Sequence, residues 1–175
     1  TWMDMFIGTL RAKYPQATIN YENIAVGGKQ SKWGMQNIAT QLALLTKKPD
    51  LMVLAFGGND LLGGVSPEDF GTRTQGIIEG LRNEENTNGN ANAEVLLWSP
   101  KINNPVSTKY LVEYFLAYET ALETIAKNTN GVGLAKVSSY MADVLNSKEA
   151  VDYLNTNVNH GNDFCSRMIA QGLIT

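Results

Sequence analysis

A continuous apolar run, Leu-Met-Val-Leu-Ala-Phe at residues 51–56, constrains this chain more than any other feature. A run of this kind is typical of a strand that is buried on both faces. Such strands occur in parallel sheets with helices packed on both sides. The rest of the chain must therefore supply further strands and the helices that cover them.

The apolar period along the chain switches repeatedly between 2 and 3.6 residues, which predicts alternating strands and helices. The expected strands are Ala17–Ala25, Leu51–Phe56, Glu94–Trp98 and Val132–Val137. The expected helices are one through Trp2, Phe6 and Leu10 with Thr1 as its N-cap, then Met35–Leu45, Ser66–Arg82, Leu111–Ile125, Met141–Leu145, Lys148–Leu154 and Asp163–Leu173. This order predicts a three-layer α/β/α sandwich with a mainly parallel sheet, built as one domain over residues 1–175.

Composition excludes several classes of function. With 14 Lys and Arg, 17 Asp and Glu and no basic cluster, the chain has little electrostatic basis for binding nucleic acid. No apolar run approaches the ~18 residues that a membrane-spanning helix requires. One cysteine, Cys165, and one histidine, His160, exclude both a disulfide framework and a Cys/His zinc site.

Polar and glycine-rich residues follow three of the expected strands. They are Gly27-Gly28, Gly57 to Asp60 and Ser99-Pro100. In open parallel sheets, ligands bind beyond the carboxyl ends of the strands. The sequence therefore predicts a functional site at this edge of the sheet.

Three segments of the chain resemble sequence blocks of a known enzyme family: Asn23 to Gly28, Phe56-Gly57-Gly58-Asn59-Asp60, and Asn159-His160-Gly161-Asn162-Asp163-Phe164. In order and spacing they resemble the second, third and fifth sequence blocks of the SGNH (GDSL-type) hydrolases. The resemblance covers essentially the whole chain. It implies a flavodoxin-like sheet and serine acyl transfer that needs no cofactor or metal.

By this resemblance, the backbone N–H of Gly28 and the side-chain amide of Asn59 donate to the oxyanion of the tetrahedral intermediate. Glycine allows the backbone a close approach, and an amide is a neutral donor. His160 is the general base, since an imidazole can take a proton from a serine and return it to the leaving alcohol.

The chain departs from the family at the nucleophile, because it contains no Gly-Asp-Ser segment. No serine of the chain matches that position. In the family this block ends the first strand, which lies between the strands expected at Ala17–Ala25 and Leu51–Phe56. We therefore expect an N-terminally incomplete domain whose missing first strand and serine belong to an upstream segment of the same protein.

A second departure concerns the group that orients His160. The family usually has Asp three residues before the histidine, whereas this chain has Asn157. An amide can orient an imidazole but cannot offset its positive charge. Either a Ser-His dyad operates with a backbone carbonyl orienting His160, or Asp152 or Asp163 replaces the missing carboxylate.

Three functions remain open at this point. The first is an SGNH-type esterase that removes a short acyl group, such as acetyl, from a small ester or an acylated carbohydrate. The second is a catalytically inactive SGNH-like module that binds glycan or protein. The third is a flavodoxin-like phosphate or nucleotide binder, which is disfavoured because the chain has no Walker A or Gly-x-Gly-x-x-Gly motif.

Several of these residues also have ordinary structural interpretations. The glycine pairs and Asn59-Asp60 suit strand-to-helix turns, and His160 suits a helix cap. Trp33 is either a core residue or a stacking platform for a sugar. For Cys165 we expect buried packing, and for the stripe Tyr110, Tyr114, Tyr118 a helix face against the sheet.

Overall fold

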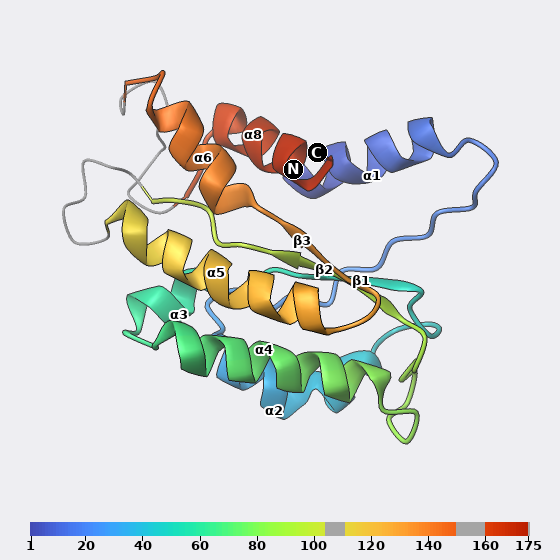
Figure 1. Ribbon diagram of the computed structural model, residues 1–175. Coiled ribbons are helices and arrows are strands. Elements are labelled where there is room, and N and C mark those ends of the chain that lie inside the picture. Colours follow the sequence, from blue (N-terminus) through green and yellow to red (C-terminus); the bar gives the residue numbers. More distant parts are fainter. Residues whose placement is uncertain (104–110, 150–159, 175) are drawn as a thin grey trace.

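The computed structural model describes residues 1–103, 111–149 and 160–174 (Figure 1). Its elements, in chain order, are α1 (Trp2–Lys13), α2 (Ser31–Leu42), β1 (Leu51–Leu54), α3 (Gly58–Leu62), α4 (Pro67–Arg82), β2 (Glu94–Trp98), α5 (Val112–Asn128), β3 (Val132–Ala135), α6 (Val137–Leu145) and α8 (Asp163–Ile174). No helix of these ranges is long and apolar enough to cross a membrane.

The three strands form a parallel sheet in the order β1-β2-β3. Leu54 is in register with Leu97, and Leu97 with Leu134, so the three carboxyl ends lie at one edge. Helices α2, α4 and α5 lie on one side of the sheet, and α1, α6 and α8 lie on the other (Figure 1). The expected α/β architecture with helices on both sides of a parallel sheet is confirmed.

Helix α4 begins as its sequence predicts. The side-chain oxygen of Ser66 accepts a hydrogen bond of 3.1 Å from the backbone N–H of Asp69, and Pro67 occupies the first turn, where its missing N–H costs nothing. The face that α4 buries is apolar and consists of Phe70, Ile77, Ile78 and Leu81. Full burial of a side chain of this size contributes about 1.5–3 kcal/mol, so this face anchors the lower layer.

The opposite layer forms where α8 packs against α1 and α6. Phe6 of α1, Met141 of α6 and Met168 of α8 are all buried there. Cys165 is 2% exposed, which confirms the expectation that it packs in the interior. Asn162 caps α8, because its Oδ1 accepts a hydrogen bond of 3.0 Å from the N–H of Cys165.

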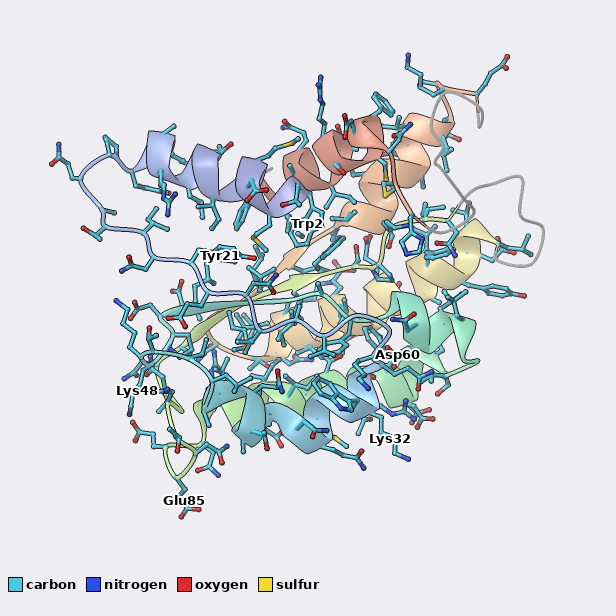
Figure 2. The ribbon with its side chains drawn as sticks, turned by 180° about the vertical axis from the view of Figure 1, so that it is seen from behind. Trp2, Tyr21, Lys32, Lys48, Asp60 and Glu85 are labelled. Carbon is cyan, nitrogen blue, oxygen red and sulfur yellow. The ribbon has the colours of Figure 1, made fainter. Side chains whose placement is uncertain are left out.

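The prediction of a strand at Ala17–Ala25 is wrong. These residues form no ladder, and the segment carries the chain from α1 on one side of the sheet to α2 on the other (Figures 1 and 2). Side-chain contacts tie it in place, including one from Arg11 to the carbonyl of Ile19. Within the described part of the chain, no strand pairs with the outer edge of β1. An apolar alternation becomes a strand only when a neighbouring strand accepts its hydrogen bonds.

The tyrosine stripe expected to face the sheet is only partly buried. Tyr118 is 2% exposed, stacks on Phe70 of α4 with ring centroids 4.6 Å apart, and donates its hydroxyl to the carbonyl of Val65. Tyr114 is 49% exposed, and Tyr110 lies outside the described residues. Tyr118 therefore joins α5 to α4 rather than α5 to the sheet.

The remaining differences are local. Helix α3 was not expected, and the strand expected at Val132–Val137 ends at Ala135 because Val137 begins α6. Of the helix expected at Lys148–Leu154, residues 150–154 lie outside the described residues. The polar stretch 83–92 lies at the amino-terminal edge of the sheet, where Asn90 Nδ2 donates to the carbonyl of Pro49 at 2.9 Å. It is therefore far from the carboxyl ends of the strands.

Candidate active site

A pocket of about 210 Å³ opens at the carboxyl ends of β1 and β2. Its lining comes from the turn before α2, from the residues that follow β1 and β2, and from the residue two positions before the cap of α8. The lining residues are Lys29, Ala55, Phe56, Gly57, Gly58, Asn59, Leu62, Trp98, Pro100, Lys101, Asn103 and His160. The expected edge of the sheet thus carries a pocket, and the pocket contains both Asn59 and His160.

Asn59 lies in the first turn of α3 and is exposed to the pocket. Its Nδ2 donates a hydrogen bond of 3.2 Å to the backbone carbonyl of Lys29. The backbone carbonyl of Asn59 accepts a hydrogen bond of 3.1 Å from Gln30 Nε2. A side-chain amide carries two N–H groups. The amide is therefore held by one N–H and presents a second N–H donor.

Asp60, the next residue, is turned away from the pocket and is 0% exposed (Figure 2). Its carboxylate accepts hydrogen bonds from the backbone N–H and the hydroxyl of Ser31, the first residue of α2, and lies 3.7 Å from Arg73. A carboxylate at a helix N-terminus satisfies a donor that has no partner in the helix. Asp60 is therefore a structural residue that joins α2 to α3.

Gly57 makes the sharp turn from β1 into α3. Its φ is +113°, and a Cβ at this position would lie 3.1 Å from Pro100 and 3.2 Å from Phe70. Both the backbone conformation and the available space therefore require glycine here. This turn brings Asn59 back over the end of the strand.

Gly28 has a φ of +75° and lies in the exposed turn that precedes α2. It is not itself part of the pocket lining, but the next residue, Lys29, is. The hydrogen bond between Lys29 and Asn59 ties this turn to α3. The structure thus brings two of the resembling segments together, with Gly28 one residue from the contact.

His160 lies at the pocket and is exposed. The cap that Asn162 makes on α8 fixes the chain two residues later. Of the groups considered for orienting His160, Asn157 and Asp152 lie outside the described residues. Asp163 is exposed in the first turn of α8 and does not line the pocket.

Two lining residues that sequence reasoning missed follow β2: Lys101 and Asn103. The Lys101 ammonium is buried, and burial lowers its pKa, an effect that nearby Cys165 partly opposes. Asn103 is 7% exposed. The sequence signal for both was present, because they continue the Ser99-Pro100 segment at the predicted edge.

A buried polar network holds that segment in place. Ser99 Oγ donates to the Glu119 carboxylate at 2.6 Å and accepts from the N–H of Ser138 at 2.9 Å. Ser138 in turn donates its hydroxyl to the carbonyl of Pro100 at 2.6 Å. The network joins the end of β2 to α5 and α6, and so fixes the floor of the pocket.

An apolar groove of about 360 Å³ adjoins the pocket and shares Leu62 with it. It lies between α3 and α5 and is lined by Leu61, Leu62, Gly64, Val65, Pro67, Tyr114, Ala117 and Tyr118. Trp33, for which a core position and a stacking platform were both considered, is half-buried and is not part of either lining. Its ring instead lies under Lys29, whose Nζ is 5.4 Å from the ring centroid.

The described residues contain no group of three or more His, Cys, Asp or Glu side chains that could hold a metal ion. The pocket's own lining offers backbone and side-chain N–H donors and one imidazole. Such a set can bind an oxygen anion and transfer a proton.

The chain matches the model of the GDSL-like lipase/acylhydrolase family over residues 1–163. No curated protein sequence matches it. Among solved structures, it resembles TesA with a TM-score of 0.65 at 19% identity, over 97% of this chain and 84% of that chain. It also resembles AlinE4, described as an SGNH-hydrolase family esterase, with a TM-score of 0.58 at 20% identity, over 95% of this chain and 86% of the other. At these identities the solved structures show a shared fold.

Proposed function

Because the chain belongs to the GDSL-like lipase/acylhydrolase family, we propose that it forms the greater part of a serine esterase that removes a short acyl group from an alcohol. The observation that carries this proposal is that the exposed amide of Asn59 and the imidazole of His160 line the same pocket. These are a donor for an oxyanion and a base for a hydroxyl, the two groups that acyl transfer needs besides a nucleophile.

In the proposed reaction, a serine hydroxyl attacks the ester carbonyl carbon while His160 takes the hydroxyl proton. The Asn59 amide and the N–H of Gly28 donate to the oxygen that becomes negative. The intermediate collapses, the alcohol leaves with the proton from His160, and an acyl-enzyme remains. Water, deprotonated by His160, then attacks the acyl carbonyl carbon. The bond to the serine oxygen breaks, His160 returns the proton to that oxygen, and the acid is released.

The serine is proposed to lie on a segment of the protein outside these 175 residues, since the chain has no Gly-Asp-Ser block. Two features support the position of that segment. Among the described residues the outer edge of β1 has no partner, and residues 17–25 run past this side of the sheet without a ladder of their own. A strand that paired with β1 would end at the pocket, where a serine at its carboxyl end would face Asn59 and His160.

The orientation of His160 is also a proposal. A Ser-His dyad, with a backbone carbonyl accepting from the second ring nitrogen, requires no carboxylate at Asn157. Replacing Asn157 with Asp distinguishes the two arrangements. A large gain in turnover would indicate that Asn157 is a defect, whereas unchanged turnover would indicate that another group orients His160.

For the acyl group we propose acetyl or another short chain, and for the alcohol a carbohydrate. The volume of about 210 Å³ suits a small group, and Asn59 and Asn103 can hydrogen-bond hydroxyls. Rates with nitrophenyl esters of increasing chain length test this directly. A maximum at a medium chain would contradict the proposal and point to the apolar groove beside Leu62.

The decisive experiment is intact mass spectrometry of the purified, folded protein before and after a fluorophosphonate probe. We expect one adduct, on a serine outside residues 1–175, and no ester turnover in His160→Ala. A folded protein that forms no adduct and hydrolyses no ester would favour the alternative, a binding module that retains the cleft without the nucleophile.

A further inference from the structure

The charge of the pocket differs in sign from that of the chain. The whole sequence has 17 acidic and 14 basic residues and a net charge of −3. Among the described residues, however, the pocket lining includes Lys29, Lys101 and His160 and no aspartate or glutamate. A concave site lined by one sign of charge concentrates ligands of the opposite sign.

Two residues of the pocket lining carry buried hydrogen-bond donors that have no acceptor among the described residues. The ammonium nitrogen of Lys101 and the indole Nε1 of Trp98 are both buried and make no hydrogen bond within the described part of the chain. Neither group can accept a hydrogen bond. Buried donors without acceptors are costly, and a buried charge more so, which makes them markers of a missing ligand.

No neighbouring side chain of the described residues neutralises Lys101. The ion pairs among the described residues join other groups, and none of them includes Lys101. The ionisable group that acts on it is the thiol of Cys165, but burial raises the pKa of that thiol. Cys165 therefore stays neutral at ordinary pH and supplies no counter-charge.

We infer that the pocket binds an anionic group of the substrate, with Lys101 as its main partner and with Trp98 and Lys29 beside it. The substrate class is then an ester that carries a carboxylate, phosphate or sulfate close to the scissile bond. Since Asn59 and His160 line the same pocket, the anion lies within one small ligand's reach of the reacting carbonyl. This inference rests on the proposed esterase function and narrows its substrate.

The anion is carried either by the acyl group or by the alcohol, and two pairs of esters separate these cases. The first pair is nitrophenyl hemisuccinate and neutral nitrophenyl butyrate. The second is 4-acetoxybenzoate and its neutral methyl ester. In each pair the measured quantity is the ratio of kcat/KM for the anionic ester to kcat/KM for the neutral one.

We expect the unmodified protein to prefer the anionic member of at least one pair. Lys101→Met should lower that ratio about tenfold or more, as expected for loss of a hydrogen bond to a charged group. Lys29→Met should lower it less, because Lys29 is exposed. Lys32→Met is the matched control, since Lys32 points outward from α2, away from the pocket (Figure 2), and should leave the ratio unchanged.

Ratios that are the same in Lys101→Met and in the unmodified protein for both pairs would overturn the inference. If none of the four esters is cleaved, the proposed function fails, and binding of inorganic phosphate then decides the anion site. Phosphate should shift the indole N–H resonance of Trp98 in the unmodified protein and not in Lys101→Met. The absence of such a shift would refute the anion site itself.

Discussion

The carboxylate of Asp60 accepts hydrogen bonds from both the backbone N–H and the hydroxyl of Ser31, at 3.0 Å and 2.5 Å. The two residues are 29 positions apart. The contact joins the start of α2 to α3, so that the turn at Lys29 lies against Asn59. The geometry of the candidate site therefore depends on a buried pair that does not itself line the pocket.

Removal of this carboxylate should strongly destabilise the fold. Asp60→Ala leaves the N–H and hydroxyl of Ser31 and the nearby Arg73 without their buried acceptor, and we expect a loss of about 3 kcal/mol in the free energy of unfolding. Urea denaturation measures it. The control is Asp143→Ala on the exposed side of α6, which should change stability by less than about 0.5 kcal/mol. Equal effects of the two substitutions would show that the Asp60 contact contributes nothing.

The turn at Gly57 predicts opposite effects on stability when Gly57 and its neighbour Gly58 are each replaced with alanine. Gly57→Ala forces a φ of +113° on alanine and places its Cβ against Pro100 and Phe70, so it should cost about 2 kcal/mol or more. Gly58→Ala adds a Cβ with no atom within 4 Å in the first turn of α3, and should be neutral or stabilise by up to about 1 kcal/mol. Thermal unfolding of both variants checks the pair, and a destabilising Gly58→Ala would contradict this account of the turn.

Local patterns were enough to predict most of the elements. The apolar run at 51–56 became β1, and Ser66-Pro67 became the start of α4, because burial and capping are encoded in neighbouring residues. The segment 17–25 failed for a reason that no local pattern contains. Whether an alternating segment forms a strand depends on a partner, and this segment pairs with no strand of the described residues.

The position of the site was predicted more fully than the residues that line it. The edge followed from the polar residues after the expected strands, and Asn59 and His160 followed from the resemblance to the SGNH blocks. Lys101 was missed because a lone lysine after a strand looks like a surface residue, and only the packing around it shows that its ammonium is buried. The structural role of Asp60 likewise appears only when α2 and α3 meet.

Asn59→Ala tests the proposed oxyanion donor. Because the donor acts on charge that develops in the transition state, kcat should fall by about 10²-fold or more while KM changes little. Asn20→Ala, in the exposed segment before α2, is the control and should retain full turnover. Circular dichroism of both variants guards against loss of the Lys29 contact as the cause. A rise in KM at constant kcat would assign Asn59 to substrate binding alone.

The buried charge of Lys101 predicts that Lys101→Met is more stable than the unmodified protein. Without its anion the ammonium is buried with no partner among the described residues, and replacing it with an apolar side chain of similar length should stabilise the fold by about 1–3 kcal/mol near neutral pH. Lys32→Met, at an exposed position of α2, should leave stability unchanged.

The pH dependence of the stability difference between Lys101→Met and the unmodified protein shows whether the buried charge causes that difference. Burial lowers the folded-state pKa of Lys101 below its ordinary value of 10.5. Between these two pKa values the unfolded chain binds more protons than the folded one, so the contribution of Lys101 to stability rises with pH in this window. The advantage of Lys101→Met should therefore be largest below the folded-state pKa and shrink as pH approaches 10.5. Melting temperatures of both proteins across this range measure the effect, and a difference that is constant with pH would show that packing, rather than the buried charge, accounts for it.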